Sequence, residues 1–289
     1  PQSIFAGEVQ MDLIARELGM DPVEFRRINL VQDGDASPLG HYWKNIMGIR
    51  TLDAAVEKAE YYQAKPQTEN KLIGRGMALC ERHVGAGSST VKITIDADGT
   101  VTLYTALPDT GSGFYTVLRQ ILGQELGVAY DQIKLENWST DDVAFETGVG
   151  GSRVTHVAGQ AVFQAAQELR RQLVTMSADM FGWPEGESGF AQGQIIAPGK
   201  TSMNLGDLVS RSGGLLEANH TYDSERDEEI TVFCVQIAEV EVDVETGQVQ
   251  LTKFTSAHDV GTILNPLGHQ GQIDGTIMQG IGYALTEDL

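Results

Sequence analysis

Two glycine-rich loops hold the residues of this chain that are best suited to bind a ligand. The first is PDTGSGF at Pro108 to Phe114, and the second is TGVGGSR at Thr147 to Arg153. Each loop leads into a helical pattern. Glycine lacks the Cβ atom that blocks close approach, and the first turn of a helix carries unpaired N–H groups and the positive end of the helix dipole. The pair of loops therefore predicts binding of one extended cofactor that bears a phosphate.

The second loop contains more glycine than the start of a helix requires, since one capping side chain would serve at a lower cost in entropy. Its glycines are Gly148, Gly150 and Gly151. Ser152 is expected to cap the following helix and to bind a ligand oxygen, and Arg153 is expected to supply a fixed positive charge. The alternative is a flexible surface loop with a solvated arginine.

The first loop matches part of a dinucleotide-binding fingerprint, because a predicted strand runs into Gly111-Ser112-Gly113 and then into a helix. Thr116 stands where the third glycine is required, and Asp109 would repel a pyrophosphate. The preceding strand is also predicted to be the second arm of a hairpin. A NAD-dependent dehydrogenase built on the Gly111 loop is therefore kept as the alternative enzyme.

Composition excludes several classes of protein. The formal net charge of −20 argues against a broad surface for nucleic acid or anionic membranes, which need clustered Lys and Arg. Cys80 and Cys234 are too few for an iron–sulfur cluster or a cysteine-rich zinc site, and His258 and His269 have no third ligand at a recognised spacing. No metal ligands are predicted. No stretch approaches the roughly 18 apolar residues of a membrane helix, so a cytoplasmic setting is expected.

The pattern of apolar residues predicts an α+β chain. Two β-hairpins, at residues 90–107 and 237–254, share the frame Gly-x-Val-x-Leu, and each precedes an Asp-x-Gly and a helical stretch. These features predict a repeated module of hairpin plus helix. The remaining expected elements are a helix pair in the first thirty residues, an amphipathic helix at 52–62, helices at 115–126 and 154–180, a strand at 133–138, and a loop region with short elements at 181–216.

Five segments together resemble one family. They are ELGMDPVEFRRINL, GRGMAL, the first glycine loop with YTVLRQILGQELGV, GGSRVTHVAGQAV, and DVGTILNPLGHQGQIDGTIMQGIGYALTEDL. In this order they resemble the molybdenum-binding (large) subunit of the xanthine dehydrogenase and aldehyde oxidase family, nearer its bacterial multi-subunit members. The resemblance implies a molybdenum-cofactor-binding fold. With a boundary placed at residues 63–72, it implies the helical end of a first molybdenum-binding domain at 1–65 and a truncated second one at 66–289.

The resemblance also implies an activity, which is oxidative hydroxylation of an N-heterocycle or aldehyde-like carbon with oxygen derived from water. The cofactor would be molybdenum bound to molybdopterin, and a glutamate would act as base. Electrons would leave through iron–sulfur clusters and FAD on partner domains or subunits, so a hetero-oligomer that takes a small-molecule substrate is expected.

Site residues follow from the same resemblance. The pterin-contacting Met-Gly-Gln of the family falls on Thr110, Gly111 and Ser112, and Ser112 replaces its glutamine. A glutamine of the family near the cofactor matches Gln272. The phosphate- and pterin-binding stretch of the family falls on residues 150–155. Its expected contact residues are Gly150, Gly151, Ser152, Arg153 and Thr155.

No residue of this chain matches the catalytic glutamate of the family, which lies beyond the segment that ends at Leu289. The chain also begins at Pro1 without a methionine. It is therefore expected to be a piece of a longer polypeptide that has no activity on its own. A non-catalytic acidic scaffold that has lost the cofactor is the alternative from a different class.

Overall fold

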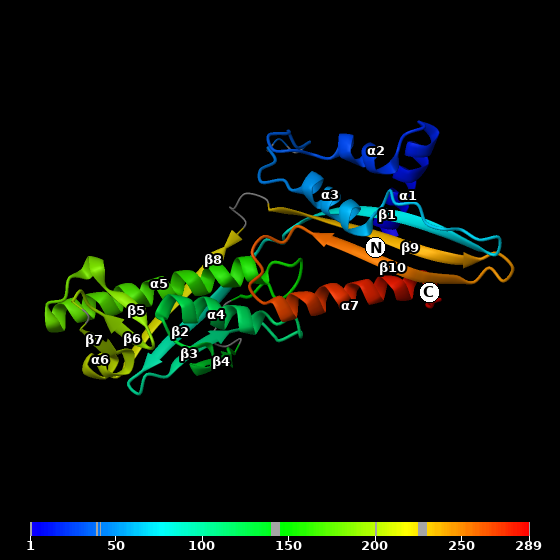
Figure 1. The fold of residues 1–289 in the computed structure, drawn as a ribbon. Helices are drawn as coiled ribbons and strands as arrows, with labels where there is room; N and C mark the ends of the chain where they lie inside the picture. Colours follow the sequence, from blue (N-terminus) through cyan, green and yellow to red (C-terminus); the bar gives the residue numbers. More distant parts are fainter. Residues whose placement is uncertain are drawn as a thin grey trace. The chain divides into compact units, whose positions relative to one another are not determined.

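The computed structural model describes residues 2–38, 40, 42–139, 145–199, 201–224 and 230–288. The chain forms two compact units, and each unit takes two separate segments of the sequence (Figure 1). Unit 1 contains Pro1–Val84 and Glu229–Thr262, and unit 2 contains Gly85–Glu228 and Ile263–Leu289. The boundary expected at residues 63–72 separates two family domains along the sequence, which the division into compact units does not test. It therefore stays a prediction.

Unit 1 is an antiparallel three-stranded sheet with helices packed on one face. The strand order is β1-β9-β10, and the strands are β1 (Lys71–His83), β9 (Thr231–Asp243) and β10 (Val249–His258). The helices are α1 (Gln2–Glu17), α2 (Pro22–Asn29) and α3 (Gly48–Ala59). Alternate residues of β9 are buried, so Val235 and Ile237 join Leu52 of α3 and Met77 of β1 in one apolar core.

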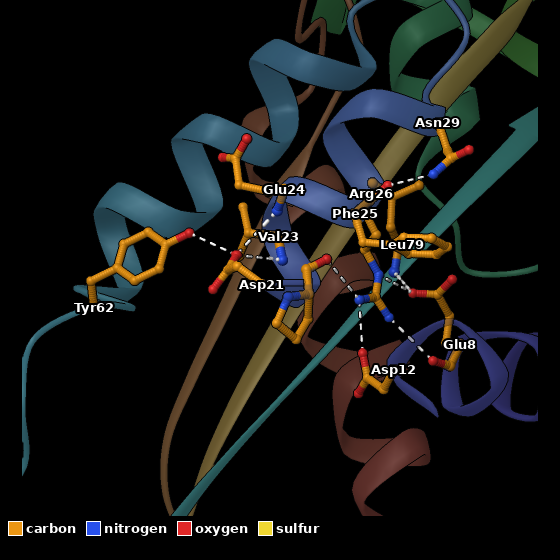
Figure 2. A network of polar contacts seen from close by, with 11 residues as sticks. Glu8, Asp12, Asp21, Val23, Glu24, Phe25, Arg26, Asn29, Tyr62 and Leu79 are labelled. Carbon is orange, nitrogen blue, oxygen red and sulfur yellow. Dashed lines mark hydrogen bonds and ion pairs between the residues drawn. The ribbon is translucent and has the colours of Figure 1, made fainter. Parts of the chain in front are cut away.

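A network of polar contacts fixes α1 and α2 to β1 in unit 1 (Figure 2). Arg26 is only 5% exposed, and its guanidinium donates to Glu8 Oε2 at 2.9 Å and to Asp12 Oδ1 at 2.8 Å. Glu8 Oε2 also accepts the N–H of Leu79 at 2.6 Å. Because a buried guanidinium needs both charge and hydrogen-bond partners, this network determines how the two helices lie on the sheet.

Asp21 begins α2, as the Asp-Pro pair predicts. Its Oδ1 accepts the N–H groups of Val23 and Glu24 at 2.9 and 3.1 Å. The same oxygen accepts the hydroxyl of Tyr62 at 3.0 Å (Figure 2). Partial desolvation of the ring, together with this carboxylate, raises the pKa of Tyr62 to about 12.

Unit 2 is built on a four-stranded sheet in the order β4-β3-β2-β8, covered on one face by two long helices (Figure 1). The β3-β4 pair is parallel and the other pairs are antiparallel. The strands are β2 (Ser88–Asp96), β3 (Val101–Thr105), β4 (Ile133–Asn137) and β8 (Leu215–Asp223), and the helices are α4 (Phe114–Leu126) and α5 (Val154–Phe181). Ile93, Leu103, Leu118 and Leu169 lie in the core between the layers, fully buried.

Unit 2 also contains several short elements and two further α-helices. A small sheet has the order β5-β6-β7. These elements are η1 (Tyr130–Gln132), η2 (Glu185–Glu187), β5 (Gly189–Ala191), β6 (Gln194–Ile196), β7 (Ser202–Asn204), α6 (Leu205–Arg211) and α7 (Pro266–Leu285). Within the described ranges, no helix combines the length and the apolar character needed to cross a membrane.

The predicted hairpins and the helices that follow them are confirmed. Strands β2 and β3 pair with Val91 opposite Thr105, and β9 pairs with β10. Helices α4 and α7 follow the two hairpins along the chain. Strands β1 and β8 were not predicted, because each buries only one residue, Met77 and Ala218, and therefore carries little apolar alternation.

Candidate functional site

Helices α4 and α5 lie side by side and run in the same direction (Figure 1). A Cβ atom added to Gly159 of α5 would lie 3.1 Å from Ile121 Cδ1 of α4. One turn further along α4, Glu125 forms hydrogen bonds with Gln167 and Arg170, which lie further along α5. Since contacts advance together along both helices, the helices are parallel. The two glycine loops, which precede them, therefore lie at the same end of the pair.

The start of α7 lies beside the first loop. Asn265 caps α7 by accepting the Gly268 N–H at 3.0 Å, and its Nδ2 lies 3.4 Å from the carbonyl oxygen of Gly113. A Cβ atom at Gly113 would lie only 3.0 Å from that Nδ2, and Gly113 has a φ of +80°. The N-termini of α4, α5 and α7 thus meet at one end of unit 2, where their dipoles favour a negative charge.

The second loop reaches α5 through two successive residues in the left-handed conformation, Gly151 at φ +60° and Ser152 at φ +59°. Helix α5 begins at Val154 with Arg153 as its N-cap residue and without a side-chain cap. The prediction that Ser152 caps this helix is therefore wrong, because Ser152 lies one residue before the N-cap. In the part of the chain that the structure describes, the amide N–H groups of Gly150, Gly151 and Ser152 have no hydrogen-bond partner.

A second glycine segment, Gly85-Ala86-Gly87, supports this loop and was missed in the sequence. The Gly85 N–H donates to the carbonyl oxygen of Gly151 at 2.8 Å, and Gly87 exchanges hydrogen bonds with the hydroxyl of Ser224 at 3.1 Å. The Ser88 N–H donates to Thr147 Oγ1 at 3.0 Å. Two glycines directly before a predicted strand are a signal for such close approach of two backbones.

Arg153 does not have the position that the solvated-arginine alternative requires. The residue is 5% exposed, and its guanidinium donates to two backbone carbonyl groups. Its Nη1 donates to Ala86 O at 2.8 Å, its Nε donates to Gly148 O at 3.0 Å, and its Nη2 also donates to Gly148 O. The side chain therefore connects the two glycine segments.

One amide of the first loop is bonded within the loop itself. Asp109 Oδ1 accepts the N–H of Gly111 at 2.9 Å, so this amide is already satisfied within the loop. Ser112 is partly exposed. Strand β3, which leads into the loop, is the second arm of an antiparallel hairpin, unlike the first strand of a dinucleotide-binding unit. The other predicted contact residues, Thr155 in the first turn of α5 and Gln272 in the second turn of α7, are both exposed.

The two thiols are free and partly buried, and Cys234 Sγ lies 3.8 Å from His258 Nε2. Cys80 and Cys234 lie opposite each other in β1 and β9, and burial raises the pKa of the Cys234 thiol to about 11 and also raises that of Cys80. His258 Nε2 lies 2.6 Å from Ser256 Oγ. Among the residues with a described position, no three His, Cys, Asp or Glu side chains are grouped to hold a metal ion.

Comparison with known proteins gives a family. The molybdopterin cofactor-binding domain matches residues 50–289, and a second domain of the same description matches residues 1–30. The chain is 28% identical to the xanthine dehydrogenase molybdenum-binding subunit of Escherichia coli O157:H7 over 312 residues, which cover 100% of this chain and 41% of that protein. It is 30% identical to the aldehyde oxidoreductase of Megalodesulfovibrio gigas, with coverage of 100% and 32%.

Solved structures agree with this result. The structure of quinoline 2-oxidoreductase from Pseudomonas putida 86 superimposes with a TM-score of 0.85 at 25% identity, and the match covers 96% of this chain and 39% of that one. The chain thus spans about two fifths or less of the relatives it matches. The α+β fold class is confirmed, and the NAD-dependent alternative gains no support. This chain belongs to the molybdopterin cofactor-binding domains of the xanthine dehydrogenase and aldehyde oxidoreductase family.

Proposed function

We propose that this chain supplies part of the cofactor site of a molybdenum-dependent hydroxylase. The observation that carries the proposal is the run of amide groups at Gly150, Gly151 and Ser152 that have no partner among the described residues. They precede a 28-residue helix that has no side-chain cap. Backbone amides at a helix N-terminus bind phosphate and other anionic groups without any basic side chain. This suits a chain with a net charge of −20, because anion binding must then be local.

The donor set fits a pterin that carries a phosphate. The amides and hydroxyl of the Ser152 region and the exposed hydroxyl of Thr155 are hydrogen-bond donors that lie at the positive end of α5. When bound, the molybdenum–molybdopterin cofactor supplies a two-electron redox centre. The part of this chain is to bind and orient that group, with Gly150, Gly151, Ser152 and Thr155 as its principal contacts.

The first loop and α7 are assigned a smaller part. Gly111 allows close approach by its lack of a side chain, since its amide is already bonded to Asp109. Ser112 offers a hydroxyl in place of the longer glutamine amide expected there, and Gln272 lies on the helix that starts beside this loop. These three residues would be further contacts of the pterin.

The wider function follows from the relatives and is part of the same proposal. Similar proteins include a nicotine 6-hydroxylase large subunit from Paenarthrobacter nicotinovorans and the aldehyde oxidoreductase already named. The proposed reaction is therefore hydroxylation of an N-heterocycle or an aldehyde-like carbon with oxygen from water. An iron–sulfur subunit and an FAD subunit would accept the electrons in a cytoplasmic hetero-oligomer. A boundary near residue 65 would separate the end of a first molybdenum-binding domain from the second.

A charge test at Ser152 examines the proposal. Ser152→Asp and Ser152→Asn introduce side chains of equal size that both tolerate the left-handed conformation. At a separation of about 6 Å and an effective dielectric constant of about 20, a carboxylate repels a bound anion by roughly 3 kcal/mol, or about a hundredfold in affinity. The complete protein with the Asp change should therefore lose most of its molybdenum and pterin, measured by elemental analysis and pterin fluorescence, whereas the Asn variant should retain them.

Three results would count against the proposal. Equal molybdenum content in the Asp and Asn variants would mean that no anion lies close to Ser152. Complete wild-type protein that contains neither molybdenum nor pterin would favour the non-catalytic scaffold. Tight NAD binding without molybdenum would instead favour the dehydrogenase alternative.

A further inference from the structure

We infer that Arg153 is a positioning residue that fixes the second glycine loop from within and does not itself contact the anionic ligand. The inference rests on the proposed function for the identity of the ligand, but its geometric part does not. The guanidinium is buried, with 5% of the residue exposed, whereas the next residue toward the N-terminus, Ser152, is exposed. A side chain that bound a ligand at the loop surface would present its donors there.

Each of the three guanidinium nitrogens of Arg153 donates a hydrogen bond to the backbone. Nε and Nη2 both donate to the carbonyl oxygen of Gly148, and Nη1 donates to that of Ala86 at 2.8 Å. The planar fork of a guanidinium can serve two carbonyl groups at fixed angles, which an ammonium group cannot reproduce. The side chain therefore acts as a brace between residues 85–87 and 147–151.

The space around the guanidinium is shaped for it. Gly87 has a φ of +135°, and a Cβ atom added there would overlap Arg153 Nη1 and would lie 2.8 Å from Thr147 Oγ1. Glycine is thus required at this position for two reasons. Other residues rarely adopt this backbone conformation, and a side chain would occupy the space of the Arg153 guanidinium. The absence of a side chain at Gly87 and the presence of Arg153 are two parts of one arrangement.

Both the N–H and the carbonyl oxygen of Gly148 form hydrogen bonds to side chains. While its carbonyl oxygen accepts from Arg153, its N–H donates to Glu146 Oε1 at 3.2 Å. The other carboxylate oxygen of Glu146 accepts the hydroxyl of Ser89 at 2.8 Å, and Ser89 is itself only 2% exposed. The base of the loop is therefore bonded to strand β2, and the amides of Gly150, Gly151 and Ser152, which follow it, are held in place without taking part in these bonds.

Hydrogen exchange in the complete protein, prepared without cofactor, tests the positioning role directly. Three variants are compared with wild type: Arg153→Lys, which keeps the charge, Arg153→Gln, which removes it, and Gly87→Ala, which displaces the guanidinium. The bonded amides of Gly85, Thr147 and Gly148 should exchange about tenfold faster in all three variants. Arg171→Lys is the matched control, because Arg171 is exposed and forms its ion pair with Glu168 on the same helix. It should leave these amides unchanged.

Retention of cofactor in the loaded protein gives the second readout. If Arg153 acts only by bracing the loop, the Lys and Gln variants should lose molybdenum at similar, faster rates, since both lack the fork. If Arg153 contacted the anion by its charge, the Lys variant should retain far more cofactor than the Gln variant, and exchange without cofactor should stay normal. That pattern would overturn the inference, as would unchanged exchange in all three variants. Absence of molybdenum from wild type would refute the proposed function, and the exchange result would still decide the positioning role.

Discussion

The amide nitrogen of Gly85 lies 2.8 Å from the carbonyl oxygen of Gly151 and donates a hydrogen bond to it. This bond joins the entry to strand β2 with the loop that starts α5. A Cβ atom on Gly85 would lie 3.1 Å from that oxygen and 3.2 Å from Gly151 Cα, so the two backbones are in contact with no space for a side chain. The contact therefore helps to position the amides of Gly150, Gly151 and Ser152, which have no partner among the residues whose positions are described.

Gly85→Ala should therefore disturb the loop more than the fold. The added methyl group must displace the Gly151 peptide by a few tenths of an ångström, and the expected loss of stability is about 1 kcal/mol. Cofactor content of the complete protein should fall clearly, measured as molybdenum per polypeptide. Gly186→Ala is the control, since a Cβ atom there meets nothing within 4 Å. Normal molybdenum content in Gly85→Ala would mean that the contact does not position the loop.

Gly206→Ala should destabilise unit 2 without any effect specific to the cofactor. A Cβ atom at Gly206 of α6 would overlap the backbone nitrogen of Gly99 and lie 2.7 Å from its Cα, so the turn between β2 and β3 must move. Overpacking against backbone costs about 1–3 kcal/mol, measured as the free energy of unfolding in urea. Gly186→Ala again serves as the control and should change this free energy by less than about 0.5 kcal/mol.

Arg26→Met should destabilise unit 1 strongly. Removal of the guanidinium leaves Glu8 and Asp12 without their partner, and the Glu8 side chain is only 15% exposed. Loss of one member of a buried ionic network costs about 3 kcal/mol or more in unfolding free energy. Arg171→Met removes an exposed ion pair with Glu168 and should cost less than about 0.5 kcal/mol. Similar values for the two variants would contradict the buried role of Arg26.

The Arg75–Glu239 pair should make the stability of unit 1 dependent on pH. Arg75 Nε donates to Glu239 Oε2 at 2.8 Å, and this bond, with Lys65 and Lys253 nearby, lowers the pKa of Glu239 below its ordinary value of 4.5. A lowered folded-state pKa stabilises the fold above pH 4.5, and the contribution is lost as the pH falls through the folded-state value.

Glu239→Gln should thus be less stable than wild type at pH 7, and the difference should shrink as the pH falls below about 4.5. Urea unfolding at a series of pH values measures this difference in unfolding free energy. Glu217→Gln is the control, because Glu217 is exposed and lies 4.0 Å from Lys92. A difference between Glu239→Gln and wild type that is constant from pH 7 to the acid limit would contradict the assignment.

The two thiols should react slowly in the folded protein. Burial raises the pKa of Cys234 to about 11, and that of Cys80 is raised by the same cause, so little thiolate is present at pH 8. Alkylation by iodoacetamide at pH 8, followed by mass spectrometry, should label both cysteines much faster after unfolding in urea than before. Equal rates in the two states would show that the thiols are accessible and ordinary.

The sequence determined the elements that carry strong apolar periodicity. The hairpins β2-β3 and β9-β10 and the helices α4 and α5 are readable because alternate or helically spaced apolar residues must face a core. The excess of glycine in TGVGGSR likewise marks the loop before α5. Strands β1 and β8 were not readable, since each buries a single residue and their positions are determined by pairing with distant strands.

Only the tertiary structure decided what each residue of the loop does. Sequence patterns suggested that Ser152 caps α5 and that Arg153 supplies a fixed positive charge to a ligand, because both residue types commonly play these parts. The fold instead buries Arg153 beneath the loop. The segment Gly85-Ala86-Gly87 passes so close that the carbonyl oxygen of Ala86 accepts a hydrogen bond from the guanidinium. That contact joins residues far apart in the chain, so no local pattern encodes it. The sequence specified a loop able to bind an anion, and the packing of a second glycine segment against it decided which of its groups remain available.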